Sequence, residues 1–281
     1  MKKILIPTDF SKEATFALES AYPLAQKKGA EIVLVNVIED PHDYSFNTMG
    51  IAGYSPEENI YIVQLIRKTE ERMKALVADP AYAGVSMSFE VKIGKTFDKI
   101  FEVIERLKPD LVVMGSSGAS GLDEVFVGSN AEKLSRFSSV PVITVKARRD
   151  LVNIKNIVYA SDLREEQGVI MNDLKALQKL YGAKLHILKV FEPVWVNDQE
   201  VKERIQKFAD HFQLENYTVN TFHDPDEAEG ILLFAGQNNA DLIAMSTHPR
   251  KGLGVLLGGM ISKNVINHTQ IPVWTKAIKK K

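Results

Sequence analysis

The chain has 281 residues, 45% of them hydrophobic and 25% charged, and its formal net charge of −1 leaves neither half with an electrostatic bias. This composition is typical of a soluble globular protein and argues against a dedicated nucleic-acid-binding face. The chain has no cysteine, which excludes disulfides and cysteine-based zinc sites, and no apolar run is long enough for a membrane span or a signal peptide. We therefore expect a cytoplasmic protein that binds neither nucleic acid nor membrane.

Strands and helices are predicted to alternate along the first half of the chain. A helix should begin after Ser11, a plausible N-cap, and end at Gly29, with a kink at Pro23. Thr96 is expected to cap a later helix. The strands are predicted at 3–6, 31–38, 85–93, 110–114 and 141–145, and the further helices at 59–77, 96–107 and 129–137. This alternation implies parallel strands with right-handed crossovers and helices on both faces.

The second half of the chain repeats the first. The sequence KKILIPTDFSKE at 2–13 resembles KNIVYASDLREE at 155–166, an offset of 153 residues, and SSVPVIT from Ser138 matches TQIPVWT from Thr269 at an offset of 131. The second copy is therefore shorter by 22 residues, lost between its second and third strands. The predicted fold is α/β, with two tandem open doubly wound five-stranded parallel sheets, one in domain 1–147 and one in domain 153–281.

A glycine-rich stretch, MGSSGASGLDEVFVGSN at 114–130, follows the fourth predicted strand. It lacks the lysine of the familiar phosphate loop. However, glycine lets the backbone approach a ligand closely, and a helix N-terminus offers free N–H donors to an anion. Gly128 and Ser129 stand where the next helix should begin. The stretch is therefore either a phosphate cradle made of backbone N–H groups or an ordinary strand-to-helix turn.

Asp9 follows the first predicted strand, at the edge where an open α/β sheet binds its ligand. Its carboxylate could accept a hydrogen bond from a ribose hydroxyl. It could equally be a turn or capping residue before the helix at Ser11, which is the ordinary role of an aspartate there. The sequence leaves both interpretations open.

Four segments of the first half together resemble the universal stress protein family. They are the opening ILIPTDFS, the second strand IVLVNVIED, the closing SSVPVITV and the spacing Gly115-x2-Gly118-x9-Gly128-Ser129, which matches that family's ATP-binding signature. The resemblance covers the whole chain as two tandem copies. It implies a strand order of 3-2-1-4-5 in each copy and an ATP-binding stress-response protein, with Mg²⁺ as a companion of the nucleotide.

The same resemblance implies which residues contact the nucleotide. Adenine and ribose would lie near the ends of the first two strands, and the triphosphate over the glycine-rich loop. The implied adenosine contacts are Pro7, Thr8, Asp9 and Val37, and the implied phosphate contacts are Met114, Gly115, Gly118, Gly128, Ser129 and the backbone N–H of Asn130.

The second copy departs from this signature in its matching stretch, MSTHPRKGLGVLLGGMI at 245–261. Ser246 and Pro249 replace the first two glycines, and Met260 replaces the serine. Proline has no N–H and a fixed φ, so Pro249 removes a donor and the freedom of the turn. Although Asp162 keeps the position of Asp9, we expect nucleotide in the first domain only.

The sequence offers little for catalysis. It contains no Gly-Lys-Ser/Thr loop, Gly-x-Ser-x-Gly elbow or His-Glu-x-x-His motif, so no catalytic residue and no resident metal is predicted. Slow ATP hydrolysis is the alternative to a purely regulatory role. For the second domain the alternatives are a different anionic ligand beside His248, or a metal ion held by His248, His223 and Asp224.

The last strand of each copy, at 140–145 and 271–275, should form an exposed sheet edge, and such edges tend to pair. The resemblance implies that these strands pair within the chain as a pseudo-dimer, and further self-association into a homo-oligomer is compatible with it. The extra segment of the first copy, at 41–59, is either a lid over the nucleotide or an ordinary surface loop.

Overall fold

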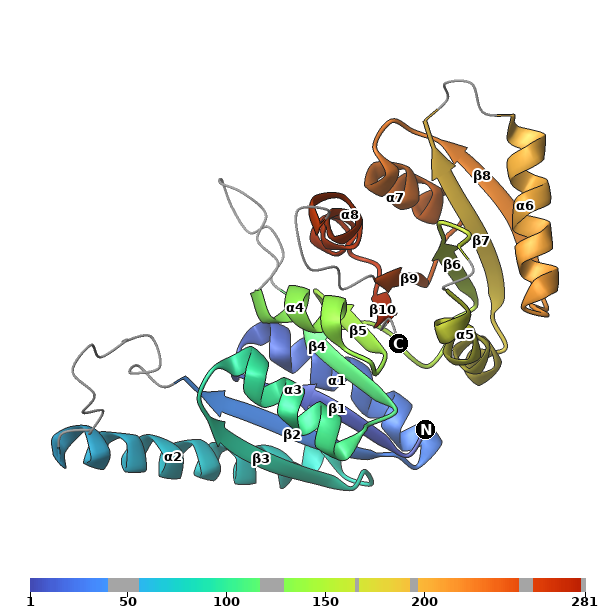
Figure 1. Cartoon of the computed structure of the whole chain (residues 1–281). Helices are drawn as coiled ribbons and strands as arrows, with labels where there is room; N and C mark the ends of the chain where they lie inside the picture. Colours follow the sequence, from blue (N-terminus) through green and yellow to red (C-terminus); the bar gives the residue numbers. More distant parts are fainter. Residues whose placement is uncertain (40–55, 117–128, 165–166, 193–196, 248–254, 279–281) are drawn as a thin grey trace.

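The computed structural model describes residues 1–39, 56–116, 129–164, 167–192, 197–247 and 255–278 (Figure 1). Strands and helices alternate as predicted. The first half contains β1 (Lys3–Pro7), α1 (Lys12–Lys28), β2 (Glu31–Ile38), α2 (Pro56–Val77), a 3-10 turn (Pro80–Tyr82), β3 (Met87–Ile93), α3 (Thr96–Leu107), β4 (Leu111–Gly115), α4 (Ser129–Phe137) and β5 (Val142–Val145). Of the extra segment at 41–59, residues 41–55 lie outside the described residues and the rest begin α2.

The second half repeats this order with shorter connections. It contains β6 (Asn156–Ala160), α5 (Gly168–Tyr181), β7 (Lys184–Phe191), α6 (Asp198–His211), β8 (Tyr217–His223), α7 (Glu227–Gln237), β9 (Leu242–Thr247), α8 (Val255–His268) and β10 (Val273–Ala277). The helix between its second and third strands, α6, is shorter than α2, which accounts for part of the residues that this half lacks.

All ten strands form one continuous sheet, in the order β3-β2-β1-β4-β5-β10-β9-β6-β7-β8. Each half keeps the expected order 3-2-1-4-5 with parallel neighbours. The prediction of two separate sheets was wrong, because β5 and β10 pair antiparallel, with Ile143 opposite Trp274 (Figure 1). This contact gives the unpaired edge of each half a partner, and it confirms the expected pseudo-dimer.

The core consists of two hydrophobic layers, one on each face of the sheet. Ile4 and Ile6 belong to one layer and Leu5, between them, belongs to the other, as the alternation of side chains along a strand requires. The first layer is covered by α1, α2, α5 and α6, and the second by α3, α4, α7 and α8. Both layers continue from one half into the other.

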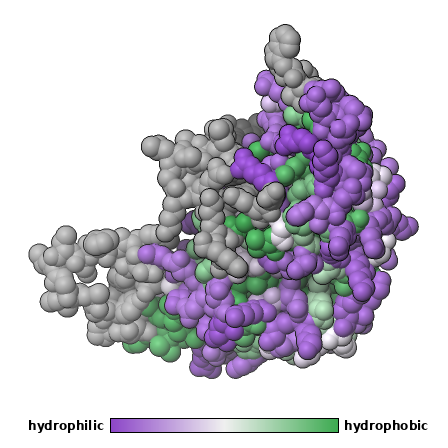
Figure 2. All heavy atoms as spheres, turned by 45° about the vertical axis from the view of Figure 1, so that its right-hand side comes forward, coloured by the Kyte–Doolittle hydropathy of each residue, from purple (hydrophilic) through white to green (hydrophobic). Residues whose placement is uncertain are grey.

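The surface is mostly hydrophilic on the face shown, as expected from the composition of the chain. Hydrophilic residues cover most of the described surface on the face shown in Figure 2. The largest exposed hydrophobic side chains include three neighbours on α2, Ile60, Tyr61 and Val63. No helix in the described part of the chain is long and apolar enough to cross a membrane.

Capping signals in the sequence fix both ends of α1. The Ser11 hydroxyl accepts a hydrogen bond from the N–H of Ala14 at 3.2 Å, and Gly29 ends the helix in the left-handed region, at a φ of +61°. The helix runs through Pro23 from Lys12 to Lys28, and the kink expected at Pro23 stays a prediction. Because only four residues separate the end of β1 from the start of α1, the first turn of α1 lies at the carboxyl edge of the sheet.

An aspartate before the fourth strand ties each half together. Oδ2 of Asp110 accepts hydrogen bonds from the backbone N–H groups of Lys2 and Lys3, at 2.6 and 2.9 Å. Asp241 does the same for Lys155 and Asn156, at 2.8 and 2.9 Å. Partial burial acts to raise the pKa of Asp110, but the two backbone donors and the charge of Lys2 outweigh it and hold that pKa below its ordinary value.

We expect Asp110→Ala to lower the free energy of unfolding by about 1 kcal/mol at pH 7, the usual net value of hydrogen bonds at a partly exposed group. Since the pKa of Asp110 is lowered in the folded protein, this stabilisation is present above the unfolded pKa of about 3.9 and is lost as the pH falls through the folded value. Urea titrations of both proteins between pH 7 and pH 2 measure the difference. The exposed Glu215→Ala serves as the control; a gap that does not close on acidification would contradict the assignment.

Candidate functional site

A cleft of about 480 Å³ lies at the carboxyl edge of the first-half sheet. It is bounded by the ends of β1, β2 and β4 and by the first turns of α1, α3 and α4. In the order 3-2-1-4-5, the strand order reverses between β1 and β4, which is where open α/β sheets bind their ligands. The volume lies within the usual range for small-molecule sites, about 300–1,000 Å³.

The turn after β1 is held by a set of short hydrogen bonds. The N–H of Thr8 donates to the carbonyl of Val35, and the Asn36 amide donates to the carbonyl of Thr8, both at 2.8 Å. The hydroxyl oxygen of Thr8 accepts from the N–H of Phe10 at 3.1 Å, with Phe10 in the left-handed region at a φ of +64°. Backbone and side chains thus fix the position of Asp9 at the mouth of the cleft.

Asp9 itself is exposed, and one of its two carboxylate oxygens accepts a hydrogen bond from the described residues. Its Oδ1 accepts a hydrogen bond from the N–H of Ser11 at 2.9 Å, which is the turn role that the sequence allowed. Its Oδ2 has no hydrogen-bond partner among the described residues. The turn role and a ligand role are therefore compatible, because each uses a different oxygen of the carboxylate.

Gly115, the last residue of β4, lies directly against the first turn of α1. A Cβ placed on it would come within 2.3 Å of the backbone carbonyl carbon and oxygen of Glu13. The glycine is therefore needed for close packing of strand and helix, a reason that the sequence motif did not reveal. The second half has Ser246 at this position. Its first helix, α5, begins at Gly168, which corresponds to Thr15, so it begins three residues later in the repeat than α1 does.

The structure brings most of the predicted site residues to this one cleft. Ser129 is the first residue of α4, and Gly118 and Gly128 lie outside the described residues. The predicted residues that line the cleft are Pro7, Thr8, Asp9, Val37, Met114, Gly115 and Asn130. Their role in holding a nucleotide stays a prediction.

Several lining residues were missed by the sequence analysis. Thr96 was expected to cap α3, but the N-cap is Lys95, and the Thr96 hydroxyl instead donates to Oε1 of Glu39 at 2.7 Å. This bond joins the end of β2 to the start of α3. With Asp9 and Glu13, Glu39 makes three carboxylates in the lining, and the described lining residues include no lysine or arginine. Only the position of Glu39, at the end of a buried strand, could have signalled it.

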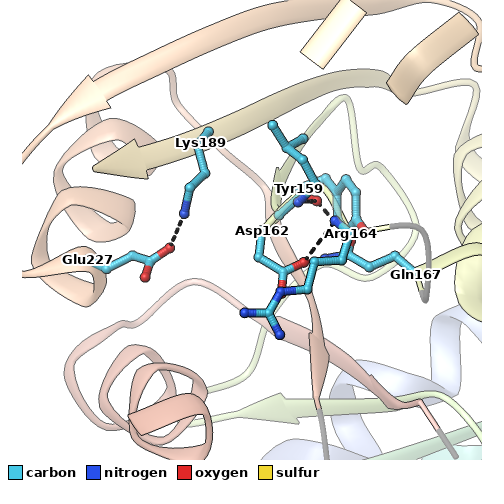
Figure 3. Close-up of polar contacts among 8 residues, drawn as sticks. Tyr159, Asp162, Arg164, Gln167, Lys189 and Glu227 are labelled. Atoms are coloured by element: carbon cyan, nitrogen blue, oxygen red, sulfur yellow. Dashed lines mark hydrogen bonds and ion pairs between the residues drawn. The ribbon is translucent and has the colours of Figure 1, made fainter. Parts of the chain in front are cut away.

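The second half fills the equivalent place with its own side chains (Figure 3). Gln167, which stands where the first half has Ala14, is only 1% exposed. Its amide oxygen accepts hydrogen bonds from the hydroxyls of Tyr159 and of Ser161, the latter at 2.8 Å, and its amide nitrogen donates to Oδ1 of Asp162. Aligning the two copies residue by residue would have revealed this replacement of an alanine by a glutamine.

Both oxygens of Asp162 are occupied, in contrast to those of Asp9. Nε of Arg164 lies 3.1 Å from its Oδ2, while Gln167 and the N–H of Arg164 use its Oδ1. Beside them, Nζ of Lys189 pairs with Oε1 of Glu227 at 2.9 Å (Figure 3). Asp162 and Glu227 are thus each paired with a cation among the described residues of this region.

The metal site considered for the second half gains no support from the described residues. They contain no group of three histidine, aspartate or glutamate side chains that could hold an ion. Nε2 of His223 lies 3.6 Å from Oδ1 of Asp198, and its ring packs edge-on against Phe191 with the centroids 4.5 Å apart. His248 lies outside the described residues.

Comparisons with known proteins agree on one family. The model of the "Universal stress protein family" matches residues 1–146 and 153–275. Universal stress protein MJ0577 of Methanocaldococcus jannaschii is 30% identical over 155 residues, which cover 52% of this chain and 96% of that protein. Universal stress protein MJ0531 of the same organism is 30% identical over 147 residues, covering 52% and 82%.

A solved structure shares the two-half fold. The crystal structure of a universal stress protein from Archaeoglobus fulgidus matches with a TM-score of 0.76 over 99% of this chain and 98% of that chain, at 22% sequence identity. The likeness therefore extends over both halves of the sheet, whereas each of the two archaeal relatives above matches about half of this chain.

We expect Gly115→Ala to destabilise the protein by about 1–3 kcal/mol, the usual cost of forcing a methyl group into a packed interior, because the backbone of Glu13 cannot yield as a flexible side chain would. Denaturant unfolding measures the loss. The control is Gly236→Ala, in α7, where an added Cβ meets nothing within 4 Å and alanine favours the helix by about 0.5–1 kcal/mol. Equal stability of the two variants would contradict the packing role of Gly115.

Proposed function

The chain belongs to the universal stress protein family, and we propose from this premise that it is a stress-response regulator whose first half binds ATP in the cleft beside β1 and β4. One observation carries the proposal: seven residues that the family resemblance implies as nucleotide contacts line a single cavity of suitable size. They come from four separate segments of the chain, so their meeting is not a consequence of sequence proximity.

The adenosine would lie at the ends of β1 and β2, and the phosphates at the start of α4. The free Oδ2 of Asp9 is available to a ribose hydroxyl, and Val37 and Thr8 flank the space for the base. The backbone N–H groups of Ser129 and Asn130 belong to the first turn of α4, where unsatisfied donors and the helix dipole favour an anion. Gly118 and Gly128 would complete the phosphate contacts.

We propose that Mg²⁺ enters the cleft together with the nucleotide. The described lining carries the carboxylates of Asp9, Glu13 and Glu39 and no lysine or arginine, so a bare triphosphate would meet like charge. Mg²⁺ is usually held by one or two carboxylates together with phosphate oxygens and water, and it would neutralise part of the phosphate charge. Because the described residues hold no preformed ligand cluster, the nucleotide phosphates would supply the remaining ligands.

Binding in the first half only is supported by the contacts in the second. Gln167 occupies the position of Ala14, which lines the cleft of the first half, and Asp162 is paired on both oxygens. To bind nucleotide there, the chain would have to break these contacts and leave the buried Tyr159 hydroxyl without its partner, which costs about 1–3 kcal/mol. The replacements at Ser246 and Pro249 act in the same direction.

We expect calorimetric titration with ATP to give one site per chain. We expect Ala14→Gln to weaken ATP binding at least about tenfold, or about 1.4 kcal/mol, because the longer side chain copies the arrangement of Gln167 beside Asp162. Asp9→Ala, at an exposed position, tests the same site without risk to the core. The control is Arg164→Ser, which gives the second half the residue of the first and should leave the affinity unchanged. Two equivalent sites per chain would contradict the proposal.

ATP binding should weaken at least about tenfold when EDTA removes Mg²⁺, since the carboxylates then repel the triphosphate without compensation. Equal affinity with and without Mg²⁺ would show that backbone donors suffice.

Incubation of the wild type and of Asp9→Ala with labelled ATP tests the alternative function, a slow ATPase. Product formation by the wild type that exceeds the rate of Asp9→Ala would favour the ATPase, and equal rates would favour the purely regulatory role.

A further inference from the structure

A second cavity, of about 420 Å³, lies on the opposite face of the first-half sheet. It is enclosed by α1, the last two turns of α2, the strand β2 and the turn after β1. Its floor is apolar, formed by Phe10, Leu18, Leu34 and Leu76. These four belong to or pack against the core layer under α1 and α2, whereas the lining of the nucleotide cleft includes Val35, Ile100 and Met114 from the other layer.

Most polar groups of this cavity form hydrogen bonds with other described residues, with one main exception. The Thr15 hydroxyl donates to the carbonyl of Ser11 at 3.0 Å, and Oδ1 of Asp79 accepts from the N–H of Ala81 at 2.9 Å. The exception is Arg72, whose guanidinium lies over the ring of Phe10, 3.8 Å from its centroid. Arg72 is exposed and lines the cavity, and no carboxylate pairs with it among the described residues, so its guanidinium is available to a ligand.

We propose that this cavity binds a small amphiphilic carboxylate, with its hydrocarbon chain on the apolar floor and its carboxylate on Arg72. The planar guanidinium offers parallel N–H donors that match a carboxylate, and the ring of Phe10 holds it in place. Asp79, the acidic residue of the lining, follows the end of α2 and accepts from the N–H of Ala81, and no ion pair joins it to Arg72 in the described part of the chain. An apolar body with one anionic end fits this distribution of groups.

The new site shares structure with the nucleotide cleft. Thr8 and Ala14 line both cavities, and Phe10 is bonded through its N–H to the hydroxyl of Thr8. A ligand packed on Phe10 therefore fixes the same turn that presents Asp9 to the nucleotide. Coupling between the two ligands, which rests on the proposed nucleotide function, must be reciprocal if both bind.

Decanoate is a suitable probe, and isothermal titration of the full chain without nucleotide tests the site by itself. We expect one decanoate per chain and binding at least about tenfold weaker for Arg72→Gln, the scale of a lost charged hydrogen bond. Lys74→Gln removes an equal charge from a neighbouring exposed position outside the lining and should change nothing. Ala75→Trp, at the exposed side of the cavity, should fill it and abolish binding without touching the core.

A separate control tests whether the carboxylate of decanoate contributes to binding. Decanol has the same chain without the charge and should bind at least about tenfold more weakly than decanoate. The proposal is overturned if decanoate does not bind, if decanol binds as tightly, or if Arg72→Gln and Ala75→Trp bind decanoate like the wild type. An ATP titration at saturating decanoate then measures the coupling, and its failure would bear on the nucleotide function while leaving the decanoate result in place.

Discussion

The antiparallel pairing of β5 with β10 is the contact on which the arrangement of the molecule depends. Each half is an open sheet whose last strand would otherwise present unpaired N–H and C=O groups to solvent. Three residue pairs join the two strands, and Trp274 is almost completely buried beside Ile143. Because the strands run in opposite directions, the carboxyl edges of the two half-sheets face opposite ways. The cleft of the first half and the filled turn of the second half therefore lie at opposite edges of one sheet.

The same interface secures α4, one of the helices that border the cleft. The Thr247 hydroxyl of the second half donates to the carbonyl of Ser135, near the end of α4, at 3.1 Å, and the N–H of Ala277 donates to that of Ser138 at 3.0 Å. In the reverse direction Lys146 donates to the carbonyl of Asn267, near the end of α8, and burial lowers the pKa of Lys146. The second half thus satisfies carbonyls at the end of α4, the helix whose beginning would hold the phosphates.

The two copies keep one turn and differ in what surrounds it. Leu163 repeats the left-handed backbone of Phe10, with φ values of +60° and +64°, and its N–H bonds to Ser161 as that of Phe10 bonds to Thr8. Ala14 lines the cleft of the first half, whereas Gln167 at the same position of the second half bonds to Tyr159, Ser161 and Asp162. The two copies thus share one backbone turn, and the side chains packed around it differ.

The sequence by itself determined the elements and most of the site. Apolar periodicity located the strands and helices, the Ser11 and Gly29 signals bounded α1, and the repeat offsets identified two copies with the same strand order. The family resemblance implied that residues at the ends of β1, β2 and β4 form a common site, in agreement with the meeting of strand ends at one edge of a parallel sheet. Such features are local or follow from the parallel topology, so they can be recognised without knowing how the side chains pack.

Only the tertiary structure decided how these parts meet. The resemblance implied that the last strands of the two halves pair, but only the structure showed that this antiparallel pairing joins the two half-sheets into one continuous sheet. The reason for Gly115 lies in the backbone of Glu13, 102 residues earlier in the chain. Gln167 occupies the second turn because Tyr159, Ser161 and Asp162 bond to its amide. Arg72 reaches Phe10 because α2 lies on the same face of the sheet as α1. The contacts of Gly115 and Arg72 join segments that are distant in the sequence, and those of Gln167, although local, depend on how the side chains of one turn pack.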